Sequence, residues 1–139
     1  MKQLDEQCIA KMLELAREVQ GRAYVPYSNF RVGACLLGAS GKYYLGCNIE
    51  NAAYTPTNCA ERTAVFKAVS EGEREFDAIA VVWDGEGYAM PCGVCRQVLA
   101  EFCAQDMPVI CGNKAGGYNI MSMEKILPCA FLPKDLKTI

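Results

Sequence analysis

The sequence predicts an α/β domain with helices packed on both faces of a mixed sheet, a three-layer αβα sandwich of about five strands. Helix and strand signals alternate along the chain, and one continuous apolar run, residues 78–83, has the length of a buried central strand. The chain has 139 residues, of which 52% are hydrophobic and 22% charged. A chain of this length buries roughly two thirds of its unfolded surface, so we expect one domain spanning residues 1–139.

The first third of the chain predicts a helix followed by two strands. Residues 5–20 place apolar side chains at helical spacing with charged residues between them, which is typical of an amphipathic helix lying on a core. Residues 24–30 contain a proline and polar residues that suit an irregular loop. The apolar runs 32–37 and 43–49 are separated by a Gly-Ala-Ser-Gly segment, which indicates a hairpin between two strands.

Two further helices flank the central strand. Asn58 is a suitable cap for a helix over residues 59–70, and Glu61 follows it at the spacing of a capping box. The run 78–83 is continuously apolar, so it is expected to be buried on both faces. Pro91 opens a third helix over residues 93–105. The remaining elements are short strands near residues 109–111 and 118–121, a helical turn around 123–127, and a tail interrupted by prolines.

Cysteine and histidine usage narrows the chemistry. The chain has nine cysteines and no histidine, which excludes catalysis by a Ser-His-Asp or Cys-His arrangement and any histidine-ligated metal. Nine is an odd number, and an intracellular chain is kept reduced, so a disulfide scaffold is the weaker interpretation of these residues.

Three of the cysteines are expected to meet in space. A strand ending near Ile49 leads to a helix at Cys59, and the strand ending at Trp83 leads to a helix at Cys92. If these strands are parallel neighbours, right-handed crossover brings both helix starts to one edge of the sheet. Cys92 and Cys95 have the spacing that lets both sulfurs reach one tetrahedral zinc ion. A zinc ion with only three protein ligands keeps a position open for water, as catalytic sites do.

The residues after Cys59 add a second indication of catalysis. Residues at i and i+2 do not share a helix face, so Glu61 should miss the metal and lie beside it, where a carboxylate can pass a proton between water and a substrate. Arg62 is expected to donate a hydrogen bond to a ligand sulfur, because three thiolates and one zinc ion leave a net negative charge. The alternatives are a helix-capping role for Glu61, a solvated surface position for Arg62, and a redox pair or structural zinc half-site for the Cys-x-x-Cys motif.

These motifs resemble the cytidine deaminase family, and in particular its small homotetrameric branch with three cysteine ligands. The resemblance rests first on CAERTA at residues 59–64 and PCGVCRQV at residues 91–98. It extends over most of the chain, through PYSNFRVGA at 26–34, NIENA at 48–52 and LPCAF at 127–131. The sequence departs from the family pattern at residues 55–57, Thr-Pro-Thr, and at Leu132.

The resemblance implies a zinc-dependent enzyme of pyrimidine salvage. The reaction would be hydrolytic deamination of cytidine and deoxycytidine to uridine and deoxyuridine, with release of ammonia. One Zn²⁺ per subunit would be held by Cys59, Cys92 and Cys95, with Glu61 as the catalytic proton carrier and Arg62 supporting the ligands. Family positions match Asn48 and Glu50 to the ribose hydroxyls and Phe30 to the pyrimidine. Ala60 is a further expected substrate contact, and Tyr54 and Phe131 match residues that reach the site of a neighbouring subunit, so a homotetramer with sites near its interfaces is implied.

Charge and hydropathy limit the partners. The formal net charge is −2 and the basic residues are scattered, so a nucleic-acid polymer is an unexpected partner and a small neutral nucleoside fits better. No apolar run approaches the roughly 20 residues that a membrane span needs, and residues 1–6 do not resemble a secretory signal, which favours a cytoplasmic protein. The other cysteines are expected to be small core hydrophobes: Cys8, Cys35, Cys47, Cys103, Cys111 and Cys129.

Two other functions fit parts of the pattern. A deaminase of cytosine-containing antibiotics such as blasticidin S shares the Cys-Ala-Glu and Pro-Cys-x-x-Cys motifs, although the segment 48–51 favours a plain ribose. The other is a zinc-stabilised binding or RNA-editing module, in which the metal only holds the fold and which the slightly acidic composition disfavours.

Overall fold

The structure, a computed structural model, describes residues 4–137. Within this range, ten elements follow one another. They are α1 (Glu6–Gln20), β1 (Val32–Gly38), β2 (Tyr43–Cys47), α2 (Ala60–Ser70), β3 (Phe76–Trp83), α3 (Gly93–Phe102), β4 (Pro108–Gly112), β5 (Tyr118–Ser122), α4 (Met123–Ile126) and α5 (Pro133–Lys137).

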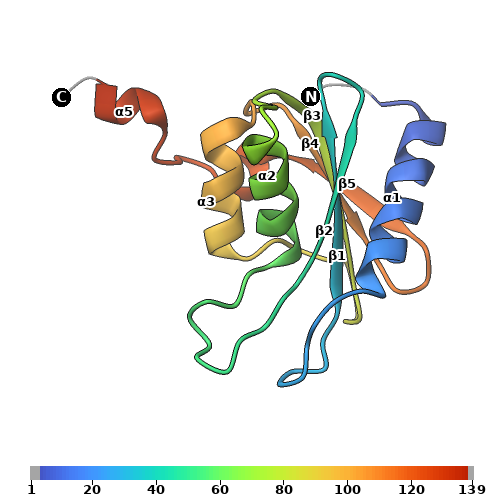
Figure 1. Cartoon of the computed structure of the whole chain (residues 1–139). Coiled ribbons are helices and arrows are strands. Elements are labelled where there is room, and N and C mark those ends of the chain that lie inside the picture. The colour runs from blue at the N-terminus through green and yellow to red at the C-terminus, as the bar shows by residue number, and fades with distance from the viewer. Residues whose placement is uncertain (1–3, 138–139) are drawn as a thin grey trace.

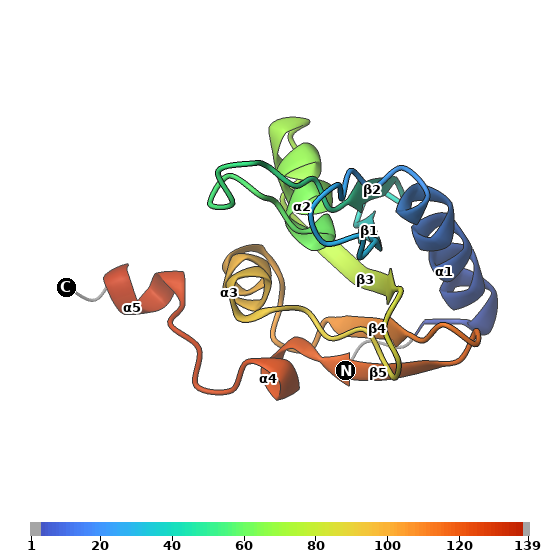
Figure 2. The ribbon, with the colours of Figure 1, turned by 90° about the horizontal axis from the view of Figure 1, so that it is seen from below.

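The strands form one mixed sheet in the order β2-β1-β3-β4-β5. β3 and β4 pair in parallel, and the other neighbouring strands pair antiparallel. Helix α1 covers one face of the sheet and α2 and α3 cover the other (Figure 1, and from below in Figure 2). The predicted three-layer αβα sandwich with five strands is therefore confirmed.

The two faces of the sheet have separate apolar cores. Under α1, the buried residues Ile9, Met12 and Leu13 pack against side chains of β1, β3 and β4. Under α2 and α3, a larger cluster includes Val65 and Leu99 from the two helices. The helices on the second face are thus held by burial of their inner sides, which is what gives a short helix most of its stability in a protein.

One condition of the metal-site prediction is met only in part. It was that β2 and β3 are parallel neighbours, but β1 lies between them and pairs antiparallel with both. Two strands that are each antiparallel to the same strand run in the same direction. β2 and β3 therefore run in the same direction, as the metal-site prediction required. As a result, α2 and α3 begin at the same edge of the sheet (Figure 1).

Three local predictions need correction. Cys59, not Asn58, is the N-cap of α2, and the Asn58 side chain instead donates from Nδ2 to Oγ1 of Thr63 at 3.1 Å. α3 ends at Phe102, short of residue 105, because Cys103 takes an extended conformation as the chain turns toward β4. The tail, which carried no predicted element, contains α5; this helix stands apart from the rest of the chain in both views (Figures 1 and 2).

The cysteines outside the expected metal site divide into core and surface residues. Cys35, Cys103 and Cys111 are buried, and burial raises the pKa of their thiols, to about 12 for Cys35 and Cys103 and about 11 for Cys111. These are small core hydrophobes, as predicted. Cys129 is exposed and has a positive φ of 57°, so that prediction is wrong for Cys129. Cys8 and Cys47 are partly buried.

No helix within residues 4–137 combines the length and the apolar character that crossing a bilayer would demand.

A glycine lets α2 approach β2 closely. A Cβ atom added at Gly46 would lie 2.3 Å from the carbonyl oxygen of Ala60 and 2.5 Å from the amide nitrogen of Ala64. Both atoms belong to the backbone of the first turns of α2, so neither can move without displacing the helix. Gly46 therefore sets the distance between β2 and the start of the helix that follows Cys59.

We predict that Gly46→Ala lowers the free energy of unfolding by about 1–3 kcal/mol, because the added methyl group overpacks a backbone contact. Urea denaturation followed by circular dichroism measures the change. Gly21→Ala is the matched control, since its Cβ would be 3.4 Å from the nearest atom, the carbonyl oxygen of Glu18, in a right-handed conformation. Equal unfolding midpoints for the two variants would contradict the close approach.

Candidate metal centre and active site

A cavity of about 470 Å³ opens where the starts of α2 and α3 meet the end of β3. Four separate segments contribute to its wall besides the central strand. They bring together Ser28, Phe30, Val32, Asn48, Glu50, Cys59, Ala60, Glu61, Val81, Trp83, Ala89, Met90 and Cys92. Residues distant in sequence thus line one hollow at the sheet edge, as is usual for ligand sites in α/β folds.

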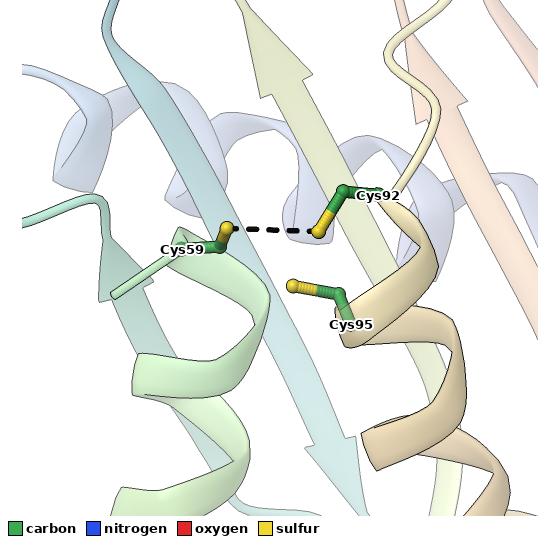
Figure 3. Close-up of side chains that lie close together, drawn as sticks. All are labelled: Cys59, Cys92 and Cys95. Atoms are coloured by element: carbon green, nitrogen blue, oxygen red, sulfur yellow. Dashed lines mark hydrogen bonds between the residues drawn. The ribbon is translucent and has the colours of Figure 1, made fainter. Parts of the chain in front are cut away.

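The three predicted metal-binding cysteines come together at this cavity. Cys59 and Cys92 are the N-cap residues of α2 and α3, and neither side chain caps its own helix. Their Sγ atoms instead lie 3.8 Å apart, and Cys95 points toward the same place from the first turn of α3 (Figure 3). The three sulfurs lie within 4.8 Å of one another.

This spacing fits zinc. Sulfurs bound at about 2.3 Å to one tetrahedral zinc ion stand roughly 3.8 Å apart, which is the separation of the Cys59 and Cys92 sulfurs. Within residues 4–137 the cluster comprises these three sulfurs, and Glu61 is not part of it. A set of three protein ligands beside a cavity is the arrangement of a catalytic zinc site, whereas structural zinc sites have four.

Positive charge lies against the sulfurs. The Arg62 guanidinium donates from Nη2 to Sγ of Cys59 at 3.2 Å, so the hydrogen bond predicted for this residue is present. The positive ends of two helix dipoles also point at the cluster. A hydrogen bond from the Cys95 thiol, and after it the one from Arg62, lowers the pKa of Cys59 to about 5. The hydrogen bond between Cys95 and Cys59, together with burial, raises the pKa of Cys95. The site thus favours a thiolate before any metal binds.

Glu61 is a buried carboxylate in the cavity wall. Only 4% of its surface is exposed, and it is the one charged residue in the buried class among the described residues. Burial raises the pKa of its carboxyl group to about 7, and the charge of Cys59 acts in the same direction. A carboxyl group with this pKa exchanges a proton readily near neutral pH, which suits a general acid and base.

Four predicted substrate-binding residues line the same cavity: Phe30, Asn48, Glu50 and Ala60. The Asn48 side chain accepts from the amide of Val32 at 2.9 Å and donates to the carbonyl oxygen of Phe30 at 2.8 Å. Glu50 accepts from the amides of Tyr27 and Ser28 and from the Ser28 hydroxyl. Asn48 and Glu50 therefore hold the loop that carries Phe30.

Tyr54 and Phe131 do not line the cavity of their own chain. Tyr54 is 72% exposed beside a neighbouring hollow, with its ring 6.1 Å from that of Tyr27. Phe131 is 58% exposed on the segment before α5, where its carbonyl oxygen accepts a hydrogen bond from Gln97. Both aromatic rings are thus presented outward.

Sequence reasoning missed Trp83 as a cavity residue. It is the last residue of β3, and its indole lines the hollow beside Phe30. The sequence could have indicated that Trp83 lies at the cavity, because the end of a central strand lies at the edge where ligands bind in α/β sheets. Val32, Ala89 and Met90, which also line the cavity, carried no comparable signal.

The fold and the cluster define a class of protein: an α/β domain with a mixed sheet and a three-cysteine cluster suited to a catalytic zinc ion. Comparison with known proteins identifies the family, because residues 6–111 match the family described as the cytidine and deoxycytidylate deaminase zinc-binding region. The chain belongs to this family.

Relatives with similar sequences extend over nearly the whole chain. It is 54% identical over 128 residues to a cytidine deaminase of Sporosarcina psychrophila, and the alignment covers 92% of this chain and 94% of the relative. It is 50% identical over 133 residues to a cytidine deaminase of Halalkalibacterium halodurans, covering 96% and 98% of the two chains. The crystal structure of cytidine deaminase from Burkholderia pseudomallei superposes with a TM-score of 0.85 at 43% identity and covers 92% of this chain and 100% of that one.

Removing one sulfur from the cluster tests it as a metal site. We predict that Cys95→Ala loses most of the zinc that the unaltered chain retains, about one ion per chain, because two remaining sulfurs do not hold the ion. Metal analysis after dialysis against a weak chelator measures the content. Cys103→Ala removes a buried thiol outside the cluster and should retain zinc. Unchanged zinc in Cys95→Ala would exclude this cluster as the metal site.

Proposed function

We propose that this chain catalyses the hydrolytic deamination of cytidine and deoxycytidine to uridine and deoxyuridine with release of ammonia. The observation that carries the proposal is a buried carboxylate, Glu61, in the wall of a cavity that is also lined by Cys59 and Cys92 of the three-cysteine cluster. The names of the similar proteins support the choice of cytidine as substrate.

The residues of this chain divide the work. Cys59, Cys92 and Cys95 would hold Zn²⁺, which supplies Lewis acidity that makes water a better nucleophile near neutral pH. Glu61 takes one proton from water and delivers it to N3 of the pyrimidine as C4 is attacked. It then takes the proton of the new hydroxyl group on C4 and transfers it to the amine, which leaves as ammonia while C4 becomes a carbonyl carbon. Arg62 stabilises the negative charge of the sulfurs through its hydrogen bond to Cys59.

The other cavity residues hold the nucleoside. Phe30 packs against the pyrimidine, Glu50 accepts hydrogen bonds from the ribose hydroxyls, and the Asn48 side-chain amide can donate to them or accept from them. The cavity volume of about 470 Å³ falls in the usual range for small-molecule sites. A smaller hollow of about 270 Å³ between α3, α4 and the segment before α5 contains none of the three metal-binding cysteines.

We predict that Glu61→Gln binds the normal amount of zinc but lowers kcat for cytidine by at least about 10²–10⁴-fold, because the amide cannot carry a proton. Zinc analysis and a spectrophotometric assay of cytidine loss measure the two properties. Glu101→Gln, an exposed change on α3, is the matched control and should leave both unchanged. Near-normal turnover by Glu61→Gln with full zinc would contradict the proposed role.

Comparing substrates separates this function from that of a related antibiotic deaminase. We expect ammonia release from cytidine and deoxycytidine and none from blasticidin S, because Asn48 and Glu50 suit a plain ribose. Release from blasticidin S alone would favour the antibiotic deaminase.

Chelation tests the remaining alternative, a binding or RNA-editing module in which zinc only holds the fold. Removal of a purely structural zinc would unfold the chain, whereas removal of a catalytic zinc should mainly abolish turnover.

We propose that the enzyme is a cytoplasmic homotetramer acting in pyrimidine salvage. The outward-facing rings of Tyr54 and Phe131, and the projection of α5 from the rest of the chain (Figure 2), are suited to contact with a neighbouring subunit near its cavity. Light scattering should give a mass close to four times the 15.2 kDa of one chain. A monomeric mass with full activity would overturn this assembly.

A further inference from the structure

Trp83 occupies a place in the site to which the proposed reaction gives no role. It ends β3, is half-buried, and lines the cavity that Glu61, Cys59 and Cys92 also line. Neither proton transfer nor metal binding needs an indole. Its position beside the residue expected to contact the pyrimidine points instead to a role in binding.

The indole is fixed on several sides. Its Nε1 donates to the carbonyl oxygen of Gly87 at 3.1 Å, which orients the ring plane. The centroid of its ring lies 5.8 Å from that of Phe30, and the two planes meet at 72°, an edge-to-face arrangement that aromatic pairs favour. A Cβ atom at Gly85 would contact both rings, at 3.2 Å for Trp83 and 3.3 Å for Phe30, so the backbone there closes over the pair.

The loop that carries Phe30 is anchored next to the same strand. Asp84 accepts from the amide of Arg31 at 3.0 Å and from its guanidinium Nε at 3.2 Å. Asn48 donates to the carbonyl oxygen of Phe30 at 2.8 Å. The backbone of Phe30 is therefore held by polar contacts, and what remains to be set is the direction of its ring, which is 37% exposed at the cavity.

We propose that Trp83 is a positioning residue that holds the Phe30 ring in the orientation that packs on the pyrimidine, and so sets how tightly the nucleoside binds. The inference rests on the proposed function, because it takes Phe30 to be the surface on which the base lies. Aromatic stacking gains from a ring that is already held in place, since less freedom is lost on binding. The same interaction is present in the ground state and the transition state, so its loss should weaken binding without slowing the chemical step.

Substitution separates this role from a purely structural one. We expect Trp83→Ala to raise KM for cytidine about tenfold with kcat within about threefold of the unaltered enzyme, and Trp83→Phe to restore most of the affinity. Tyr118→Ala, which removes an exposed aromatic ring on β5, is the control and should leave KM unchanged. Zinc content and unfolding midpoint are measured for each variant. A KM within twofold of normal for Trp83→Ala, or a fall in kcat alone, would overturn the proposal.

The protein also carries its own probe, because Trp83 is its only tryptophan. Titrating the unaltered enzyme with uridine, the product of the proposed reaction, should change the tryptophan emission in a saturable way, with no turnover to complicate the signal. This measurement needs no variant to fold. Active turnover of cytidine combined with an emission that uridine leaves unchanged would overturn the role of Trp83 while the proposed function stands. Failure to turn over cytidine would overturn the proposed function and this inference with it.

Discussion

The meeting of two helix starts at one edge of the sheet determines the rest of the site. Cys59 and Cys92 occupy equivalent N-cap positions on α2 and α3, and their sulfurs lie 3.8 Å apart because both helices begin where strands of the same direction end. Gly46 lets the first turns of α2 lie against β2. The ligand geometry is therefore a consequence of core packing, which is far more precise than a flexible loop could provide.

The same arrangement also stabilises the negative charge of the cysteine sulfurs. Three thiolates would repel one another and the neighbouring Glu61 carboxylate, which is buried away from water. Two helix N-termini and the Arg62 guanidinium compensate the sulfurs. Burial raises the pKa of Glu61 to about 7, and the charge of Cys59 acts in the same direction. A placement that is unfavourable for a charged carboxylate thus produces a group able to hold and release a proton.

Residue patterns predicted the layers of the fold and the metal cluster but not details that depend on contacts between segments. The continuous apolar run of β3 and the spacing of Cys92 and Cys95 are local signals, so they could be recognised in the sequence. The interposition of β1 between β2 and β3 could not, because antiparallel pairing on both sides leaves no distinct local pattern. Asn58 was assigned as a cap by its residue type, yet Cys59 takes that position, and its sulfur lies against that of Cys92 instead of capping the helix. The role of Trp83 became visible only beside Phe30.

The residues expected to bind the sugar also order the loop beside the base, and these two tasks are compatible. A carboxylate has roughly four sites for hydrogen bonds, and Glu50 uses three of them on Tyr27 and Ser28. The Asn48 side chain uses one acceptor site and one N–H group on the loop backbone and keeps one of each. The hydrogen bond from the Ser28 hydroxyl lowers the pKa of Glu50, which keeps it ionised as an acceptor. Each residue can therefore bind a hydroxyl group while it holds the loop, and the aromatic surface is in place before the ligand arrives.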